Sequence, residues 1–492
     1  MHRIKNISRR LQLALQLLFI PIVLLTSPSL QAQPLNQPVD TVIYHVVTTP
    51  AEDTRCSVTI NYHCAFPNSY IEYTEAKDKN FKNAFTAEVL KTHLWSTKGL
   101  EKTSTASTFY TKPRYVCRIT LTGLKPNTKY IYRIFTSPQG TSETPTHSQQ
   151  STSNASDSQD NRRDVICTEV KSFKTSADKE KWNFVAFTDF QHYNNAITHP
   201  LIQNMKKRFN PPLAICSGDM VDVAGFEQSW KWLLDSKIVS NGKGNGSAGA
   251  SATVCNTAFS NIIFAASPGD HEFWADATNG KYPQYTEPHT YNHIFRFPQN
   301  GAKTALNSSY YFYYNNVLFI SLDMNNSNIS KGERFNTQAE WFQKTLDSLQ
   351  GTYRYIVVYE HKSIFGSSII DSAVGKYIRP QWYPLFQKYN VDLVLSGHDH
   401  IYSRTFQLDG NQISADPKKG TYYLDMGSSG DKRRALDRSL TDDDTLHAKV
   451  IDLKAEKLSC AANIEVTRRE MKVSVYNQYM QLVDTFTIKA KR

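Results

Sequence analysis

The segment Val391-Asp392-Leu393-Val394-Leu395-Ser396-Gly397-His398-Asp399-His400 is an apolar run that ends in a glycine and two histidines one residue apart. Such a short apolar run is typical of a buried β-strand. Imidazole is a common metal ligand, and ligands in α/β sheets bind at the carboxyl ends of strands. The segment therefore predicts a strand that carries metal ligands at its end.

Four more apolar runs end in groups of the same kind. These are 182–187 before Asp189, 213–216 before Gly218-Asp219, 262–266 before Gly269-Asp270-His271, and 355–359 before His361. Taken alone, an aspartate after a strand is more often a helix cap, and a lone histidine is more often structural. Five such strand ends in one region favour a shared metal site instead, because the ends of parallel strands meet at one edge of a sheet.

The residue types restrict the metal. A mixture of carboxylates and imidazoles suits zinc, manganese or iron, whereas calcium and magnesium sites contain little histidine. The ligands outnumber what one ion needs. Two ions about 3.5–4 Å apart that share one carboxylate would use them all.

The remaining sequence indicates two domains of different texture. Residues 180–490 alternate apolar runs, including 317–322, with helical stretches, which predicts an α/β core. The capping box Thr337-Gln338-Ala339-Glu340 predicts the start of a helix. Residues 240–252 predict an insertion loop. Strand-like residues Tyr422–Leu424 and Met471–Tyr476 predict a β-rich layer around the core.

Residues 41–175 consist of short alternating runs separated by turn residues, which predicts an all-β sandwich. The stretch from Gly123 to Arg133 resembles the turn and following strand of fibronectin type III modules, in which a tyrosine anchors the corner. Residues 137–163, rich in Ser, Thr, Gln and Asn, predict a surface loop within this domain.

The first 32 residues have the pattern of a secretory signal peptide. Four basic residues precede the apolar run 11–25, and Ser29-Leu30-Gln31-Ala32 offers small residues for cleavage after Ala32. A membrane anchor is the alternative, although it needs about 20 apolar residues. We expect an exported protein, secreted, periplasmic or on the cell surface, with no transmembrane segment after cleavage.

Removing these 32 residues, which carry four positive and no negative charges, reduces the formal charge from +11 to +7. No lysine-arginine block marks a nucleic-acid-binding stripe. The seven cysteines include no Cys-x-x-Cys pair, so we interpret all of them as structural. In an exported chain, disulfides among Cys56, Cys64, Cys117 and Cys167 are possible, with one cysteine of the seven left over.

The motifs Gly218-Asp219-Met220-Val221-Asp222, Gly269-Asp270-His271-Glu272 and Gly397-His398-Asp399-His400 together resemble those of the calcineurin-like metallophosphoesterases. Ile401-Tyr402-Ser403-Arg404, Gly420-Thr421-Tyr422-Tyr423 and the amino-terminal sandwich are similar to the purple acid phosphatase branch. The resemblance covers nearly all of the chain after the signal peptide. It implies a metallophosphoesterase β-sandwich core flanked by helices and preceded by the all-β domain.

The resemblance implies a role for each motif position. Asp219 would bridge two ions, with Asp189 and His400 completing the first site and Asp270, His361 and His398 the second. His271 would hold the phosphate or protonate the leaving oxygen. The two cations would polarise the phosphoryl oxygens and lower the pKa of a bound water, which then attacks phosphorus.

Three positions depart from the purple acid phosphatase pattern. Asp222 stands where those enzymes have an iron-binding tyrosine, which predicts a protein without their purple colour. Gln191 replaces a histidine common in the broader family; we take Gln191 as a ligand of the first ion, with His192 as the competing candidate. Asp270 replaces an asparagine and adds one negative charge, which would strengthen cation binding and reduce Lewis acidity; the alternative is that Asp270 is protonated or bridges through water.

Several residues near these motifs have two interpretations. Asp399 is more typical of an exposed loop than of the site, and Lys362 fits phosphate attraction or a solvated surface equally well. Tyr402 and Arg404 are expected to pack and hydrogen-bond beneath the site. A group of aromatic residues either lines the substrate cleft or packs a long loop: Phe273, Trp274, Tyr282, Tyr285 and Tyr291.

The leading hypothesis is an exported phosphatase that hydrolyses phosphate monoesters with two ions of iron, zinc or manganese. A phosphodiesterase acting on nucleotides or lipid headgroups would use the same ions. The departures at Gln191, Asp222 and Asp270 also motivate a third hypothesis, a surface-binding module that has lost turnover.

Overall fold

The computed structural model describes residues 42–89, 93–95, 114–138, 165–191, 195–225, 227–235, 259–274, 287–325, 333–367, 369–436 and 444–492. All of them lie in one compact unit, Gln37–Arg492. The predicted signal peptide, the loop at 240–252 and most of the loop at 137–163 fall outside these residues. Among the described helices, none is long and apolar enough to cross a membrane.

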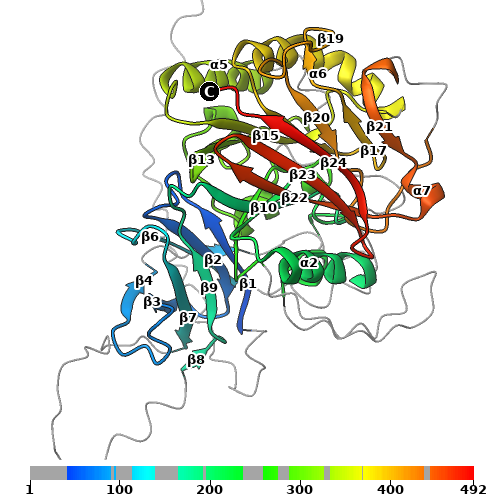
Figure 1. Cartoon of the computed structure of the whole chain (residues 1–492). Coiled ribbons are helices and arrows are strands. Elements are labelled where there is room, and N and C mark those ends of the chain that lie inside the picture. Colours follow the sequence, from blue (N-terminus) through cyan, green and yellow to red (C-terminus); the bar gives the residue numbers. More distant parts are fainter. Residues whose placement is uncertain are drawn as a thin grey trace, which may run out of the picture. The chain divides into compact units, whose positions relative to one another are not determined.

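Two large β-sheets form the core (Figure 1). The first has the order β24 (Leu482–Lys489), β23 (Glu470–Asn477), β22 (Cys460–Thr467), β10 (Lys181–Phe187), β11 (Leu213–Cys216), β12 (Ile263–Ala266), β1 (Ile43–Pro50), β2 (Val58–Cys64), β6 (Arg114–Leu121) and β5 (His93–Trp95). The second has the order β13 (Tyr310–Tyr314), β14 (Val317–Ser321), β15 (Tyr355–Lys362), β16 (Leu393–Gly397), β20 (Tyr422–Asp425), β17 (Tyr402–Thr405) and β21 (His447–Ile451). The predicted mixed α/β fold, with β-rich layers, is therefore confirmed.

Parallel pairing sets the direction of the strands that carry the site. In the first sheet β10, β11 and β12 are parallel neighbours. In the second sheet β14, β15, β16 and β20 are parallel as well. Within each sheet, the residues that follow these strands therefore emerge at one edge.

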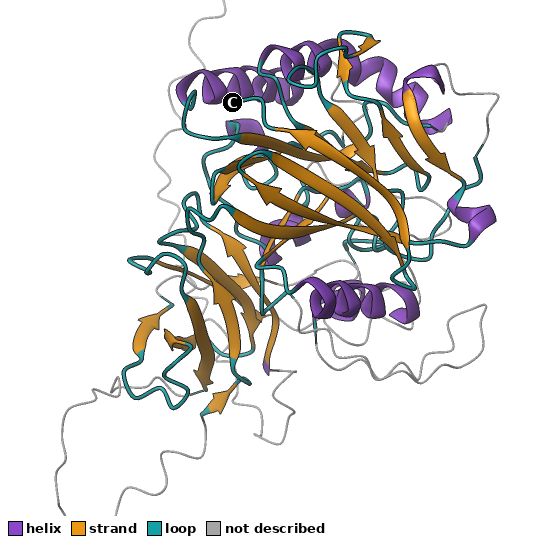
Figure 2. Ribbon diagram, in the orientation of Figure 1, coloured by secondary structure: helices purple, strands orange, loops and turns teal. Residues whose placement is uncertain are grey.

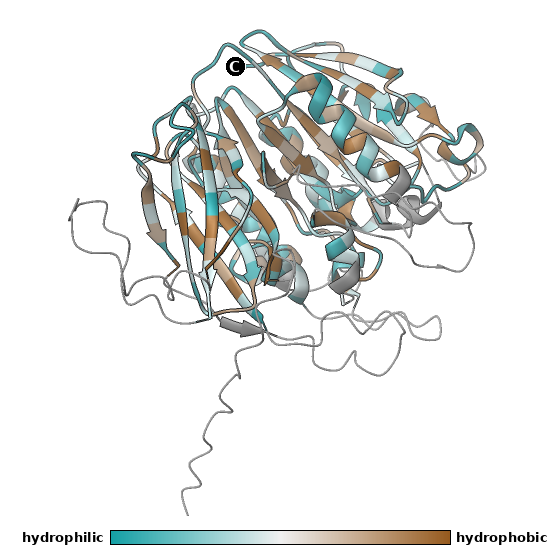
Figure 3. Cartoon of the chain, turned by 90° about the horizontal axis from the view of Figure 1, so that it is seen from below, coloured by the Kyte–Doolittle hydropathy of each residue, from teal (hydrophilic) through white to brown (hydrophobic). Residues whose placement is uncertain are grey.

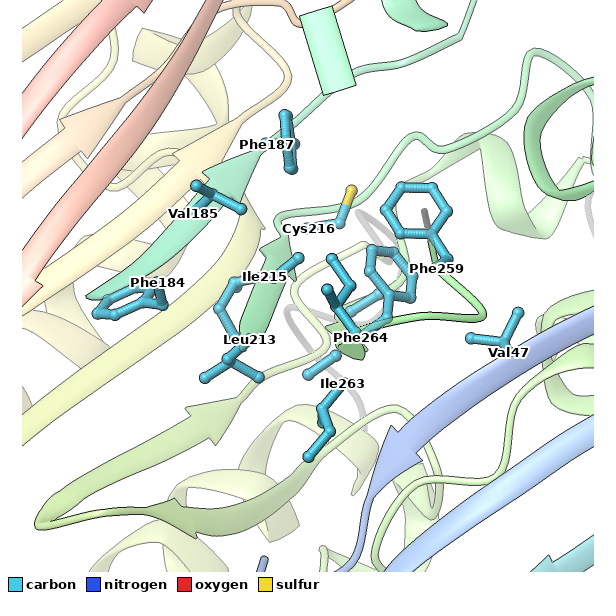
Figure 4. Close-up of a cluster of buried hydrophobic side chains, with 14 of the residues drawn as sticks. Val47, Phe184, Val185, Phe187, Leu213, Ile215, Cys216, Phe259, Ile263 and Phe264 are labelled. Atoms are coloured by element: carbon cyan, nitrogen blue, oxygen red, sulfur yellow. The ribbon is translucent and has the colours of Figure 1, made fainter. Parts of the chain in front are cut away.

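Alternating side chains in the second sheet divide the hydrophobic core. In β14, Val317 and Phe319 face the first sheet, whereas Leu318 and Ile320 face helices α5 (Glu333–Ser348) and α6 (Ile369–Lys388). Those helices lie along this sheet in Figure 2. Figure 3 shows hydrophobic residues concentrated on the central strands, and Figure 4 shows part of the cluster around Phe184, Ile215 and Phe264. The apolar strands thus act as a rigid frame for the polar residues at their ends.

The shorter elements complete the layers. Helix α2 (Asn195–Phe209) packs on the first sheet against β22, and α3 (Glu227–Leu234) lies against β1. The others are helices α4 (His289–Ile294) and α7 (Leu453–Glu456) and the two-stranded sheet of β18 (Leu408–Asp409) and β19 (Gln412–Ile413).

The amino-terminal region is a β-sandwich. Strands β1, β2, β6 and β5 belong to the first large sheet, and they face a smaller sheet of β4 (Phe85–Glu88), β3 (Asn68–Glu75), β7 (Lys129–Ser137), β8 (Ile166–Cys167) and β9 (Lys171–Lys174). The predicted tyrosine corner is present, because buried Tyr130 accepts a hydrogen bond from Lys125 N at 2.9 Å. One ladder links this region to the core, since β1 pairs with β12 at Thr48 and Ile263.

One local prediction is wrong, and the possible disulfides among the four amino-terminal cysteines are not formed. Helix α5 begins at Glu333, one turn before the expected capping box, and Gln338 instead exchanges side-chain hydrogen bonds with the backbone of Asp323. Cys56, Cys64, Cys117 and Cys167 are unbridged; Cys64 Sγ, for example, donates to Thr136 Oγ1. Burial in the sandwich raises the pKa of the Cys64 thiol to about 11, so this cysteine behaves as an inert core residue.

Candidate metal centre

The predicted ligands converge in two groups that share one aspartate. Asp219, Asp270, His361 and His398 form one group, and Asp189, Asp219 and His400 form the other. Within each group the possible ligand atoms lie within 4.8 Å of one another. A shared carboxylate between two such groups is the arrangement expected of a site for two ions.

In the larger group, the imidazole of His361 lies between two carboxylates. Its Nε2 atom is 3.2 Å from Asp219 Oδ2 and 3.2 Å from Asp270 Oδ1, and His398 Nδ1 is 3.0 Å from the same Asp270 oxygen. His361 Nδ1 lies 2.8 Å from Ser217 O, which fixes the ring with Nε2 toward the carboxylates. The ring is therefore held in a ligand orientation by its second nitrogen.

In the smaller group, His400 Nε2 lies 3.1 Å from Asp189 Oδ1, and His400 Nδ1 lies 2.7 Å from Lys432 O. Asp189 Oδ2 accepts from Thr188 Oγ1 and His398 N, whereas the buried Oδ1 faces the His400 ring. A buried carboxylate is costly unless hydrogen bonds or a cation compensate its charge. The donor set and this oxygen therefore fit a metal ion.

The electrostatics of the groups favour bound cations. Burial raises the pKa of Asp270, but the charge of His398 and hydrogen bonds to His361 and His398 outweigh it and hold that pKa well below its usual range. The carboxylates in turn raise the pKa of His361 well above its usual range, against the opposing effect of burial. The buried carboxylates thus favour positive charge beside them, which divalent ions would supply.

The backbone at the site is strained at four of the predicted ligands. The φ angles are 49° for Asp189, 49° for Asp219, 73° for His398 and 57° for His400. Residues other than glycine rarely adopt this left-handed region. Each such residue costs about 1–3 kcal/mol, and such residues concentrate at functional sites. Packing around the strand ends must supply this energy, which points to selection for the geometry of the site.

Neighbouring glycines allow the strand ends to approach each other. A Cβ atom on Gly269 would lie 2.0 Å from Asp219 Oδ1, and one on Gly218 would lie 2.7 Å from His361 Nδ1. Glu272 holds the same region, because its carboxylate accepts from the backbone N–H groups of Asp219, Met220 and Gly269. The sequence motif contains Glu272, but only the structure shows that its carboxylate joins three backbone N–H groups.

His271 lies at the edge of both groups. Its Nε2 is 3.6 Å from Asp219 Oδ2, its Nδ1 contacts Asp222 O, and the ring of Trp274 packs against it with centroids 3.5 Å apart. The carboxylate of Asp222 lies 3.7 Å from His271 Nδ1 and belongs to neither ligand group. Gln191 is buried and donates to Asp219 Oδ2, while His192 lies outside the described residues.

The structure decides several of the open interpretations. Asp399 is buried, not exposed, because the left-handed turns on either side direct its carboxylate inward to accept from Ser367 N at 2.8 Å. Lys362 is also buried, and its charge acts on Asp270 and His398, so the solvated-surface interpretation is wrong.

The residues expected beneath the site are hydrogen-bonded as predicted. Tyr402 and Arg404 both donate to Asp484, at 2.8 and 2.7 Å. Tyr291 is buried and donates to Ala266 O, so it packs the core instead of lining a cleft. Phe273 is buried as well, and Tyr282 and Tyr285 lie outside the described residues.

A cleft of about 900 Å³ lies apart from these ligands and includes Lys179, Arg354, Lys388 and Arg492 among its lining residues. Arg354 and Arg492 donate to backbone carbonyls across it. The cleft contains none of the predicted ligands, and its arginines are used to join segments of the chain.

Two sheets with carboxylates and imidazoles grouped at their parallel strand ends fit the class of metal-dependent phosphoesterases. Residues 183–402 match the calcineurin-like phosphoesterase family, and residues 43–175 match the purple acid phosphatase N-terminal domain. The chain therefore contains a calcineurin-like phosphoesterase domain preceded by a purple acid phosphatase N-terminal domain.

Solved structures share this fold. A purple acid phosphatase from yellow lupin seeds (Lupinus luteus) has a TM-score of 0.66 at 14% identity, covering 91% of this chain and 74% of its own. The structure of PhoD has a TM-score of 0.56 at 15% identity, covering 93% and 94%. At these identities the likeness concerns the fold.

Sequence relatives match shorter parts of the chain. An uncharacterized protein of Mycobacterium tuberculosis is 28% identical over 165 residues, 28% of this chain and 31% of that protein. A phosphoenolpyruvate phosphatase of Allium cepa is 25% identical over 92 residues, 17% of this chain and 19% of that protein. The chain thus spans about a third or less of the length of these relatives.

Proposed function

We propose that this chain is an exported phosphatase that hydrolyses phosphate monoesters at a site for two metal ions. The observation that carries the proposal is the pair of ligand groups joined by Asp219 at the ends of parallel strands. Asp189, Gln191 and His400 would complete the first ion site, and Asp270, His361 and His398 the second. The proposed metals are iron, zinc or manganese, which suit this mixture of carboxylate, carboxamide and imidazole.

When bound, the two ions would polarise the phosphoryl oxygens and activate a water molecule. The chain's own residues determine how the substrate is placed. His271 stands beside the shared aspartate, with its Nε2 toward the site and its Nδ1 held at Asp222 O. Because Nδ1 faces a carbonyl oxygen and so carries a hydrogen, the ring would donate from Nε2 to a phosphate oxygen or to the leaving oxygen in its doubly protonated form. The packing of Trp274 against the ring restricts its rotation.

The test compares metal content and turnover of the purified chain after addition of manganese, zinc or iron. Aryl phosphate monoesters and diesters serve as substrates, because a preference for diesters would favour the phosphodiesterase hypothesis instead. Asp219→Asn should lose both ions and reduce turnover by about a hundredfold or more. Asp416→Asn, in an exposed loop, is the matched control and should retain both.

Fewer than one ion per chain after reconstitution, with no turnover of either substrate, would contradict the proposal and favour the surface-binding module.

Asp270 provides a second test of the proposed site. Asp270→Asn removes one negative charge from the ligand groups, so the second ion should bind more weakly and polarise the substrate more strongly. We expect a higher metal requirement together with an increased maximal rate. An unchanged metal requirement would show that Asp270 is not a ligand.

The proposed export is tested by a separate measurement. The amino terminus of the protein recovered from outside the cytoplasm should begin after Ala32, as the signal-peptide pattern predicts. A retained amino-terminal segment would favour the membrane anchor.

A further inference from the structure

A loop without any recognised motif places a lysine at the metal centre. Lys432 follows strand β20 and is half-buried. Its ammonium group contacts Gln191 Oε1 and lies 3.1 Å from His271 Nε2. These two partners come from the ends of different strands, so the lysine reaches the side of the site on which His271 stands.

The loop that carries Lys432 is bonded to both ligand groups. Ser429 N and Gly430 N donate to the carbonyl oxygens of Thr188 and Asp189, at 2.8 and 3.1 Å. Farther along, Lys432 O lies 2.7 Å from His400 Nδ1.

Arg434 extends the same attachment to the other histidine. It donates from Nη1 to His398 O at 2.9 Å and from its backbone N to His400 O. The backbone of Lys432 is thereby fixed relative to the site, while its long side chain stays adjustable.

The charge of Lys432 determines what it can contact. An ammonium group cannot coordinate a cation, and two bound ions nearby would repel it. An anion held between those ions would attract it, and an ammonium group offers three donors to such an anion. Asp270, where the resembled family has asparagine, adds one negative charge to the site, and Lys432 adds one positive charge.

We propose that Lys432 is a phosphate-binding residue that donates from Nζ to a non-bridging oxygen of the substrate, beside His271. This inference rests on the proposed function and makes it more specific. A phosphate monoester carries up to two negative charges and a diester carries one, so an additional cation outside the ligand groups favours the monoester. Lys432 would therefore contribute to the choice of substrate class.

The experiment compares Lys432→Met with the matched control Lys454→Met, whose lysine is exposed on α7. Orthophosphate affinity of the metal-loaded full chain is measured by calorimetry, and metal content by mass spectrometry. Loss of a charge-assisted hydrogen bond predicts about tenfold to a hundredfold weaker phosphate binding for Lys432→Met, with both ions retained. Lys454→Met should match the wild type, and Lys432→Arg should recover most of the affinity.

Turnover gives a second readout. The specificity constant of Lys432→Met should fall more for aryl monoesters than for diesters. If this variant is unstable, Lys432→Gln provides the same comparison.

Unchanged orthophosphate affinity in Lys432→Met would overturn the inference. If the metal content of this variant also rose, the lysine would act only by balancing the negative charge of the ligand groups. A wild-type chain with two ions that binds no orthophosphate would overturn it as well. Because phosphate binding is measured without turnover, an inactive enzyme counts against the proposed function alone.

Discussion

Replacing Gly397 with alanine tests whether close packing at the end of β16 sets the geometry of the metal centre. A Cβ atom at this position would lie 2.0 Å from Thr188 Oγ1 and 2.1 Å from Asp189 Oδ2. Ordinary contact begins at 3.4 Å, so the Asp189 oxygen would have to move by about 1.3 Å. That oxygen also accepts from Thr188 Oγ1 and His398 N, and both bonds would be disturbed.

The expected magnitudes follow from this displacement. Inserting a methyl group into a filled space costs about 1–3 kcal/mol in the free energy of unfolding. Metal–ligand distances tolerate shifts of only about 0.2 Å, so a movement several times larger should disrupt the contribution of Asp189. We expect affinity for one of the two ions to fall by about tenfold to a hundredfold.

Two measurements check the prediction. Calorimetric titration of the metal-free protein with zinc or manganese gives the affinities, and urea unfolding of the metal-free protein gives the stability. Gly351→Ala is the matched control, because Gly351 has a φ of +80° but an added Cβ there would meet nothing within 4 Å. It should lose about 1 kcal/mol of stability through backbone strain and bind both ions as the wild type does. Wild-type affinity for both ions in Gly397→Ala would refute the reasoning.

Four further predictions concern stability, pH and metal. Glu272→Ala removes the acceptor of three backbone N–H groups and should lower the free energy of unfolding of the metal-free protein in urea by about 3 kcal/mol or more. A loss below about 1 kcal/mol would show that these hydrogen bonds do not stabilise the strand ends. Burial lowers the pKa of His199 to about 4, so the unfolded chain binds more protons and stability falls as the pH drops from about 6.5 to 4. His199→Leu should remove up to about 3 kcal/mol of that pH dependence, and identical pH profiles of the two proteins would exclude it. Chelation should lower the thermal midpoint of the wild type by several degrees but leave Asp219→Asn unchanged, because only bound ions stabilise the folded state by mass action. With Asp222 in place of tyrosine, the iron-loaded protein should show no tyrosinate-to-iron absorption band, and a purple preparation would disprove this.

Much of the fold was readable from local patterns. Apolar runs predicted the core strands β10, β11, β12, β14, β15 and β16 to within a few residues of the observed bounds. Alternating runs predicted the amino-terminal β-sandwich, and the tyrosine at its corner was placed from the turn before it. These predictions succeed because burial imposes a period on the sequence that adjacent residues reveal. The start of α5 was misplaced, since a capping box records a local preference that the preceding turn can override.

The candidate site divides in the same way. Residues at strand ends, such as Asp189, Asp219 and His361, were grouped correctly because the parallel arrangement brings strand ends together. Their ligand roles, and that of Gln191, stay predictions until a metal-loaded protein is measured. Asp399 was placed wrongly, because its burial depends on a hydrogen bond from Ser367, which belongs to another segment.

By itself, then, the sequence determined the class of fold, the positions of the strand ends and the chemical types of the residues that follow them. Only the tertiary structure decided that Glu272 holds three backbone N–H groups and that Lys432 reaches Gln191, 241 positions away along the chain. Such contacts produce no periodic residue pattern in the sequence, because they form where strand-end loops from distant segments pack against each other. Side-chain direction at those loops is set by left-handed backbone turns and close glycine contacts, which exist only once the sheets have formed.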